Sequence, residues 1–167
     1  MTKPYGTIML IGRFQPLHNA HLEIIKRCTA LTDQLVIVAG SAKQPRTYKN
    51  PFTFEERRQM ILAATAGLSL NVYVEPNIDT IYNDLAWAVR VQGIHSKYRC
   101  LGTRDAIIGH KKDDSSFYLD MFPQWEYINV EQIEPLGATD IRDLYFKWDF
   151  NSNFIKNVVP ETTYEFL

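Results

Sequence analysis

Short apolar runs that end in glycine alternate with helical patterns along the first quarter of the chain. Residues 5–11 (YGTIMLI) and 34–39 (QLVIVA) are predicted to be buried strands, because they are almost continuously apolar and rich in branched side chains. Between them, apolar residues at positions 22, 24, 25, 28 and 31 recur with the spacing of a helix. A strand, a helix and a second strand in this order predict a right-handed βαβ unit.

The same alternation continues through the rest of the chain. Thr53 and Glu56 have the spacing of a capping box, so we predict a helix from there to about residue 68. Further strands are predicted at 71–75, 105–108 and 125–130, and further helices at 81–92, 115–122 and 139–146. We expect Thr139 to cap the last of these helices, and 151–167 to form one or two short helices, the last beginning at Pro160.

These elements predict one α/β domain, with about five parallel strands and helices on both faces of the sheet. The domain is expected to occupy residues 1–150, with 151–167 as a C-terminal helical tail of the same domain. Within the helix at 81–92, the spacing predicts one buried face made of Ile81, Leu85, Ala88 and Val91.

Three of the predicted strands are closed by a glycine, at Gly12, Gly40 and Gly109. Ligands of an open parallel sheet bind beyond the carboxyl ends of its strands, and a glycine there lets a ligand approach the backbone closely. One such glycine is equally well explained as the end of a strand. The three together favour a ligand site at this edge of the sheet.

Composition narrows the class of protein. With 46% apolar and 13% aromatic residues, the 167-residue chain can build a core without disulfide bonds. Its two cysteines, Cys28 and Cys100, form no disulfide framework, which predicts a cytoplasmic location. No signal-peptide pattern and no apolar run of roughly 18 residues is present, so we expect no membrane partner. A net charge of −1 argues against a nucleic-acid partner.

Residues 12–21 (GRFQPLHNAH) carry the first candidate chemistry. His18 and His21 straddle a predicted helix start and share one face there, near the positive end of the helix dipole. The unpaired backbone N–H groups of that end favour an anion such as phosphate. The alternative is a pair of solvent-facing histidines with Asn19 as the N-cap. Metal ligation is disfavoured, because no cysteine or acidic residue lies nearby at ligand spacing.

The same segment resembles the H-x-G-H signature of the nucleotidylyltransferase superfamily. Its longer form is similar to the GRFQPxHxxH string of archaeal-type nicotinamide-nucleotide adenylyltransferases and of the bifunctional proteins that join this activity to a Nudix hydrolase. Residues 50–57 (NPFTFEER) resemble the family's NPFTxxER segment, and 139–142 (TDIR) resemble its S/T-x-x-R motif. Residues 109–113 and 138–146 look closest to the Nudix-fused subgroup. The resemblance covers residues 5–150 and implies a Rossmann-like nucleotidylyltransferase fold.

This resemblance implies transfer of the adenylyl group of ATP to nicotinamide mononucleotide (NMN), giving NAD⁺ and pyrophosphate. The NMN phosphate would attack the α-phosphate of ATP in line, without a covalent enzyme intermediate. The implied catalytic residues are His18, His21, Arg13 and Arg142. The implied ATP-binding residues are Gly12, Arg13, Phe14, His18, His21, Gly109, Thr139 and Arg142. The implied NMN-binding residues are Asn83, Trp87, Arg46 and Gly40, with Trp87 stacked on the nicotinamide ring. Mg²⁺ is the expected cofactor, held mainly by ATP phosphates, and no residue is assigned as a metal ligand.

Two positions depart from the family pattern: Ala20 replaces the glycine between the histidines, and Ala138 replaces the leading serine of the C-terminal motif. Two functional alternatives stay open. One is a cytidylyl or adenylyl transferase with another phosphorylated acceptor, such as nicotinate mononucleotide or phosphopantetheine. The other is a non-catalytic nucleotide sensor, which only these two departures favour. A homo-oligomer and a Nudix domain fused in a longer form also stay open.

Several side chains have a plain structural explanation beside the functional one. Lys43 and Arg46 are either phosphate contacts or part of a solvated loop, and Lys111 and Lys112 either line the ATP site or form a surface charge run. Trp125 and Trp148 are assigned to packing.

Overall fold

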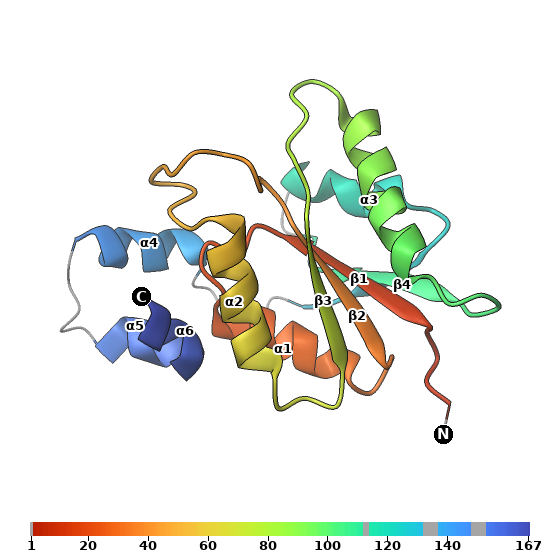
Figure 1. The fold of residues 1–167 in the computed structure, drawn as a ribbon, viewed down its shortest axis with the longest axis horizontal. Coiled ribbons are helices and arrows are strands. Elements are labelled where there is room, and N and C mark those ends of the chain that lie inside the picture. Colours follow the sequence, from red (N-terminus) through yellow and green to blue (C-terminus); the bar gives the residue numbers. More distant parts are fainter. Residues whose placement is uncertain (1, 112–113, 132–136, 148–152) are drawn as a thin grey trace.

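A computed structural model describes residues 2–111, 114–131, 137–147 and 153–167 of the protein (Figure 1). It is built on one sheet of five strands in the order β3-β2-β1-β4-β5. All neighbouring strands of this sheet are parallel, which confirms the predicted α/β class. The strands are β1 (Thr7–Gly12), β2 (Gln34–Ala39), β3 (Asn71–Pro76), β4 (Asp105–Gly109) and β5 (Glu126–Asn129).

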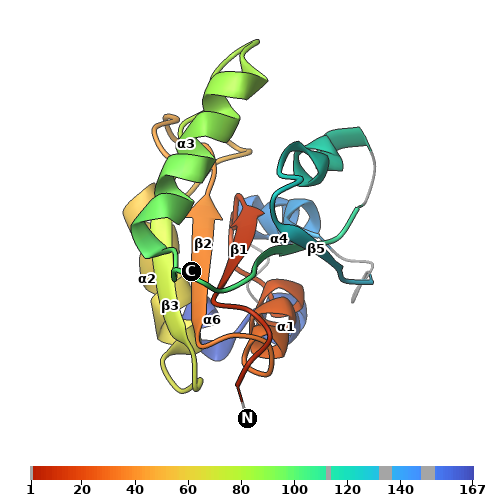
Figure 2. The same cartoon turned by 90° about the vertical axis from the view of Figure 1, so that its right-hand side faces the viewer.

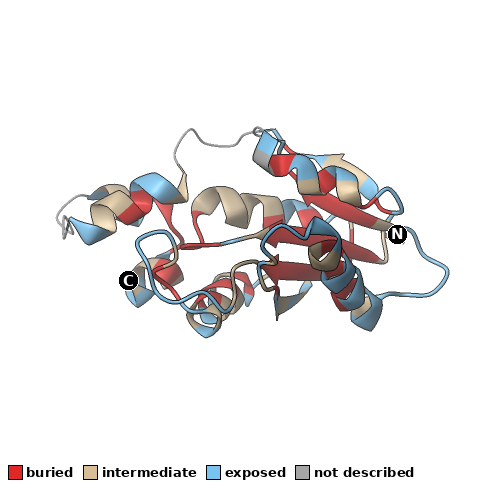
Figure 3. Ribbon diagram, turned by 90° about the horizontal axis from the view of Figure 1, so that it is seen from above, coloured by how far each residue is buried: buried red, intermediate tan, exposed pale blue. Residues whose placement is uncertain are grey.

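Helices cover both faces of the sheet, because side chains alternate between the faces along each strand. Ile8 and Leu10 of β1 pack on the side of α1 and α2, whereas Met9 and Ile11 pack on the side of α3. In Figure 3 the strands are buried between helices whose outer surfaces are exposed. The helices are α1 (Asn19–Cys28), α2 (Phe54–Thr65), α3 (Asp84–Tyr98), the 3-10 helix η1 (Asp114–Met121), α4 (Ala138–Phe146), α5 (Asn153–Val158) and α6 (Glu161–Phe166).

The strand order reverses beside β1. From β1 the chain proceeds to β2 and β3 on one side, and later to β4 and β5 on the other. The arrowheads of β1 and β2 mark their carboxyl ends in Figure 2. Gly12 and Gly109 are the last residues of β1 and β4, and Gly40 directly follows β2. The three glycines therefore lie at one edge, at the point where open α/β sheets bind ligands.

Helix α3 corrects the predicted helix at 81–92. It begins at Asp84, behind an Asn83 cap, and runs to Tyr98. Ile81 and Leu85 were predicted to be buried but are 79% and 76% exposed, because the first turn of α3 extends past the ends of the strands (Figure 1). The buried face begins one turn later and consists of Ala88, Val91, Ile94 and His95.

The cap of α4 also differs from the prediction. The N-cap is Gly137, whose N–H donates to the Asp140 carboxylate at 3.0 Å, so Thr139 lies inside the first turn. The predicted capping box of α2 is confirmed, since the Glu56 N–H donates to the Thr53 hydroxyl at 3.2 Å and the Thr53 N–H to the Glu56 carboxylate at 2.8 Å.

The C-terminal helices return to the body of the domain. Pro160 caps α6, as predicted, and α6 packs against α2. The predicted domain limit at residue 150 and Trp148 fall outside the described residues. Trp125 is buried against Phe122, with ring centroids 4.6 Å apart, which confirms its packing role. Among the helices of the described ranges, none is long and apolar enough to cross a membrane.

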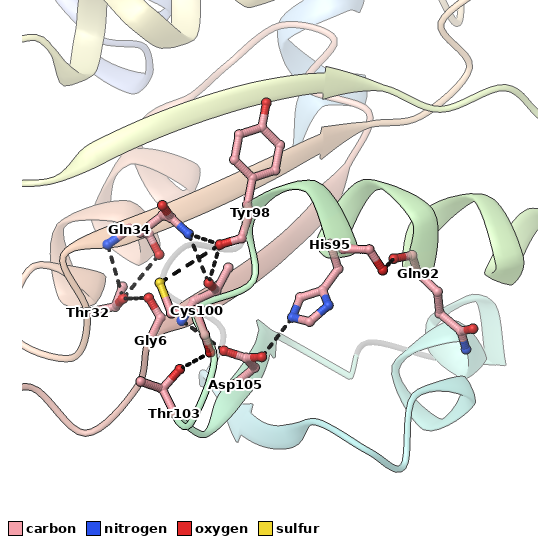
Figure 4. Close-up of polar contacts among 11 residues, drawn as sticks. Gly6, Thr32, Gln34, Gln92, His95, Tyr98, Cys100, Thr103 and Asp105 are labelled. Atoms are coloured by element: carbon pink, nitrogen blue, oxygen red, sulfur yellow. Dashed lines mark hydrogen bonds and ion pairs between the residues drawn. The ribbon is translucent and has the colours of Figure 1, made fainter.

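At the amino end of the sheet, buried polar groups bond to one another (Figure 4). His95 of α3 and Asp105 of β4 form a pair at 2.9 Å, and both side chains are less than a tenth exposed. The second carboxylate oxygen of Asp105 accepts the Thr7 N–H at 3.0 Å. The Thr7 hydroxyl accepts from the Gln34 amide at 2.9 Å and donates to the Tyr98 carbonyl at 3.2 Å. We call these five residues the amino-end network.

Candidate active site

The glycines at the carboxyl edge are explained partly by packing. Phe14 has a left-handed backbone conformation, with φ of 51°, and its ring is buried. A Cβ atom on Gly12 would lie 3.0 Å from that ring, and one on Gly109 would lie 3.0 Å from Leu119. Gly40 has no such constraint, since a Cβ there would meet its nearest neighbour at 3.8 Å. Because the Phe14 side chain belongs to the core, only its backbone could contact a ligand at this edge.

The two histidines lie together at the start of α1. Their rings stack with centroids 3.7 Å apart, and the His18 N–H donates to Nδ1 of His21 at 3.4 Å. That bond occupies Nδ1 of His21 as an acceptor, so in the neutral ring Nε2 carries the proton. His18 is buried and is itself the N-cap, while Asn19 is the first helical residue. The alternative of solvent-facing histidines behind an Asn19 cap is therefore wrong for His18 and for the cap, whereas His21 is partly exposed.

Arg142 of α4 reaches the same loop. It is only 4% exposed, and its two terminal nitrogens donate to the Gln15 carbonyl at 2.9 Å and to the Thr139 hydroxyl at 3.1 Å. Its Nε is buried without a hydrogen-bond partner among the described residues. Burial lowers the pKa of Arg142, and the positive charge of Arg13 lowers this pKa further. Arg13 thus opposes the charge of Arg142, whereas Asp143 favours it, and no carboxylate of the described residues forms an ion pair with either arginine.

Gln15 joins two of the sequence motifs. Its amide nitrogen donates to the Phe52 carbonyl at 2.9 Å, and its amide oxygen accepts the Phe52 N–H at 3.0 Å. Since the Gln15 carbonyl also accepts from Arg142, the segments at 12–21, 50–57 and 139–142 meet at one place. We call Arg13, His18, His21, Thr139 and Arg142 the carboxyl-edge site.

Two predicted contacts are engaged elsewhere. Arg46 forms two hydrogen bonds with the Glu56 carboxylate, at 2.7 and 2.9 Å, and a third with the Pro51 carbonyl at 2.8 Å. This ion pair raises the pKa of Arg46. Lys111 pairs with Asp120 at 2.6 Å, which favours the surface explanation, and Lys112 lies outside the described residues.

The predicted acceptor residues lie on the first turns of α3. The Asn83 side chain accepts the Ala86 N–H at 2.9 Å, so it has a capping role in this structure. Trp87 is half-buried and lines a pocket of about 250 Å³ with Asp79, Thr80, Asp84, Phe117 and Tyr118. Its ring meets Tyr118 edge-on at 6.0 Å. The pocket is thus lined by both aromatic and acidic side chains.

Sequence reasoning missed two buried polar residues at this edge, Gln15 and Arg57. A signal for Arg57 was present, because it lies one helical turn before Met60 and Ile61, which face the core. A charged residue on the apolar face of a helix is rarely buried without a specific set of partners.

The described residues hold no group of three or more His, Cys, Asp or Glu side chains that could bind a metal ion. A divalent cation at this edge would therefore need ligands from a bound molecule, and the oxygens of a triphosphate are suitable. This donor set is compatible with a metal that arrives with ATP.

Comparisons with known proteins agree with this geometry. A model of the cytidylyltransferase-like family matches residues 9–142. The chain is 36% identical to the nicotinamide/nicotinic acid mononucleotide adenylyltransferase of Acinetobacter baylyi, over 98% of this chain and 85% of that protein. It is 27% identical to the nicotinamide-nucleotide adenylyltransferase of Thermococcus onnurineus, over 95% and 80% of the two chains.

Solved structures give the same result. A bifunctional NMN adenylyltransferase/ADP ribose pyrophosphatase from Francisella tularensis superposes with a TM-score of 0.80 at 35% identity, over 86% of this chain and 43% of that chain. A second structure of that enzyme, complexed with AMP and a Mn ion, gives 0.78 at 32% identity, over 86% and 42%. The chain spans less than half the length of these bifunctional proteins.

The five-stranded parallel sheet has the fold of a nucleotidyltransferase, and the chain belongs to the cytidylyltransferase-like family. Within that family, it belongs to the nicotinamide-nucleotide adenylyltransferases.

Proposed function

We propose that this chain transfers the adenylyl group of ATP to NMN, producing NAD⁺ and pyrophosphate. The observation that carries this proposal is the convergence of the two histidines, Arg13 and Arg142 at the carboxyl end of β1. These groups are cationic or donate hydrogen bonds, and they lie beside a helix N-terminus, so the edge is suited to a polyanion.

The attacking group needs no general base, because the phosphate of NMN is already an anion at neutral pH. One of its oxygens forms the new bond to the α-phosphorus as the bond from that phosphorus to the bridging oxygen of the β-phosphate breaks. Pyrophosphate leaves with the electron pair of the broken bond. The protein must therefore hold several negative charges together and in line.

The residues of the carboxyl-edge site divide this task. His18 and His21 lie at the N-terminus of α1, where their N–H groups and the helix dipole stabilise charge that develops on the α-phosphate. Nε of Arg142 is a buried donor without a hydrogen-bond partner among the described residues, and we assign it to the β- or γ-phosphate of ATP, with Thr139 beside it. Arg13 supplies a further positive charge.

Mg²⁺ would neutralise part of the charge on the triphosphate, held by phosphate oxygens and water rather than by a protein cage. The backbones of Gly12, Phe14 and Gly109 line the edge that we assign to ATP. A cytoplasmic location stays a prediction.

We assign the nicotinamide ring to the pocket of Trp87. A positively charged pyridinium on an indole gains a cation–π contact, and the carboxylates of Asp79 and Asp84 favour the same charge. Arg46 would have to leave Glu56 to bind the NMN phosphate. The Gly40 N–H and carbonyl are both hydrogen-bonded within the protein, so we assign to Gly40 only a close approach of NMN to its Cα. Nicotinate mononucleotide is a second candidate acceptor, because the Acinetobacter relative is named for both mononucleotides. The carboxylates of Asp79 and Asp84 in the pocket should disfavour its extra carboxylate.

The direct test is to incubate the protein with ATP, Mg²⁺ and either mononucleotide, and to measure dinucleotide and pyrophosphate by chromatography. We expect NAD⁺ and pyrophosphate in equal amounts, and a higher kcat/KM for NMN than for nicotinate mononucleotide. A nucleotide sensor would bind ATP and release no pyrophosphate, and that result would refute the proposal.

A further inference from the structure

Arg57 of α2 lies beneath the carboxyl edge and has no role in the function proposed so far. Its side chain is one of the largest fully buried side chains of the protein, at 1% exposure. It forms no ion pair within the described residues, although Asp79 is close enough to favour its charged form. Burial lowers the pKa of Arg57 to about 10, so the guanidinium is still charged at neutral pH.

The acceptors of this guanidinium are backbone carbonyls of two neighbouring loops. One terminal nitrogen donates to the Arg13 carbonyl at 2.6 Å and to the Gly40 carbonyl at 2.8 Å. The other reaches the Ser41 carbonyl at 3.5 Å, and Nε donates to Thr53 of its own helix at 3.3 Å. A single side chain therefore bonds to the loop after β1 and to the loop after β2.

These bonds begin where the sheet ends. The last hydrogen bond between β1 and β2 in this direction runs from the Gly40 N–H to the Gly12 carbonyl, at 2.9 Å. Beyond it the two chains separate, and the next carbonyls, of Arg13 and Gly40, accept from Arg57. The guanidinium thus continues the pairing of the two strands across a gap that no backbone donor fills.

Both loops then enter an unfavourable backbone conformation. Phe14 and Ser41 have positive φ angles, 51° and 52°, and each directly follows a carbonyl that Arg57 holds. A positive φ is costly for residues other than glycine and persists only where the surroundings enforce it. Arg57 is placed to enforce both turns.

We propose that Arg57 is a positioning residue for adenylyl transfer, which sets the loop of Arg13 and the histidines against the loop that begins at Gly40. It does not reach the substrates, because it is buried beneath both loops. The inference rests on the proposed function, since the first loop carries the groups that we assign to ATP and the second those that we assign to NMN.

The test compares Arg57→Met and Arg57→Lys with the wild-type protein and with a control, His95→Ala. The control removes a buried polar side chain that joins two elements at the opposite end of the sheet. For each protein, kcat and KM for ATP and NMN are normalised to the folded fraction, and amide hydrogen exchange is measured without substrates.

We expect Arg57→Met to lower kcat/KM by about 100-fold, because a displacement of reacting groups by about 1 Å has an effect of this size. Exchange should rise at residues 13–18 and 40–45 and stay unchanged at the amino end. Arg57→Lys keeps the positive charge but not the planar guanidinium with its several donors. Its kcat/KM should recover to within about tenfold of wild type. His95→Ala should leave kcat/KM per folded molecule within about twofold, with faster exchange at the amino end alone.

The inference is overturned if Arg57→Met keeps kcat/KM within twofold, or if His95→Ala loses as much. Should Arg57→Met fail to fold, Arg57→Lys decides: wild-type kcat/KM with unchanged exchange in both loops refutes the positioning role. If instead the wild-type protein makes no dinucleotide, the proposed function is at fault, and the exchange measurements still report whether Arg57 holds the loops.

Discussion

The two ends of the sheet hold buried polar groups in opposite ways. In the amino-end network, His95 and Asp105 are paired at 2.9 Å, and the backbone of Thr7 uses the remaining carboxylate oxygen. At the carboxyl edge, Arg57 and Arg142 are buried against carbonyl groups, and the charge of Arg13 opposes both. The buried ionisable groups of the amino end pair with one another. At the carboxyl edge, no carboxylate of the described residues forms an ion pair with Arg57 or Arg142, although Asp79 and Asp143 favour their charged forms from a distance.

This difference indicates that the buried polar groups at the two ends of the sheet have different roles, one in stability and the other in function. Removing one partner of a buried hydrogen-bonded pair is strongly destabilising, because the other partner is left buried without a partner. A buried cation without an ion-pair partner costs stability in the native protein, and an anionic ligand offsets that cost on binding. Polar burial at the amino end should therefore matter for folding, and polar burial at the carboxyl edge for catalysis.

The largest expected effect is that of Arg142→Met. It removes a donor that we assign to the ATP phosphates, and we expect kcat/KM for ATP to fall by about 10²–10³-fold. The free energy of unfolding should stay equal or rise, because an opposed buried charge is lost. Steady-state kinetics and urea unfolding measure the two effects, with Arg104→Met, an exposed arginine at the amino end, as the matched control. A large loss of stability with unchanged kcat/KM would show that Arg142 serves folding rather than catalysis.

Asp105→Ala tests the other end. It leaves His95 and the Thr7 N–H without their acceptor, so the free energy of unfolding should fall by about 3 kcal/mol. Activity per folded molecule should stay near that of the wild type, because the change lies at the opposite end of the strands. Urea unfolding beside initial rates checks both statements, and a fall in kcat larger than about threefold at full folding would show that the two ends are coupled.

His18→Asn sharpens the comparison within the carboxyl-edge site. Asparagine is a favourable N-cap, so α1 keeps its first turn while the imidazole is lost. We expect kcat to fall by about 100-fold with little change in melting temperature. The matched control is Asn19→Ala, one residue further along α1, whose side chain bonds only to the Asn157 carbonyl among the contacts described. If the variant keeps a kcat near that of the wild type, His18 does not stabilise the transition state.

The smallest effect is expected for Trp87→Leu, which keeps an apolar side chain but removes the π-system. A cation–π contact of about 1 kcal/mol corresponds to a roughly fivefold rise in KM for NMN, with kcat almost unchanged. KM for ATP should not move. If KM for both substrates rises equally, Trp87 supports the fold rather than the nicotinamide ring.

The fold could be predicted from local sequence patterns. The predictions were wrong where tertiary contacts determine the bounds and the buried face of an element. Continuous apolar runs closed by glycine identified the buried strands, because a strand covered on both faces has no polar position. The helix at 81–92 was placed one turn too early, since Ile81 and Leu85 fit its periodicity but extend past the sheet that would bury them. Periodicity reports a possible apolar face and does not report where the partner surface ends.

The candidate site was predictable in outline for a different reason. His18 and His21 share a helix start, so sequence spacing alone places them together. The pairing of Arg46 with Glu56 was not predictable from spacing, because a ten-residue separation across a loop fixes no distance. Nor were the bonds from Arg57 to Arg13 and Gly40, which depend on where two strands separate.

The guanidinium of Arg57 also links the local unfolding of helix α2 to that of the two loops it bonds to. It is buried on helix α2 while bonding to the two loops above β1 and β2, so α2 cannot detach without breaking these bonds to both loops. We therefore expect helix and loops to open as one cooperative unit, separate from the end of the sheet where His95 and Asp105 pair. Heat or a protease that opens α2 is then expected to release both loops in the same event, even while the rest of the sheet is still folded.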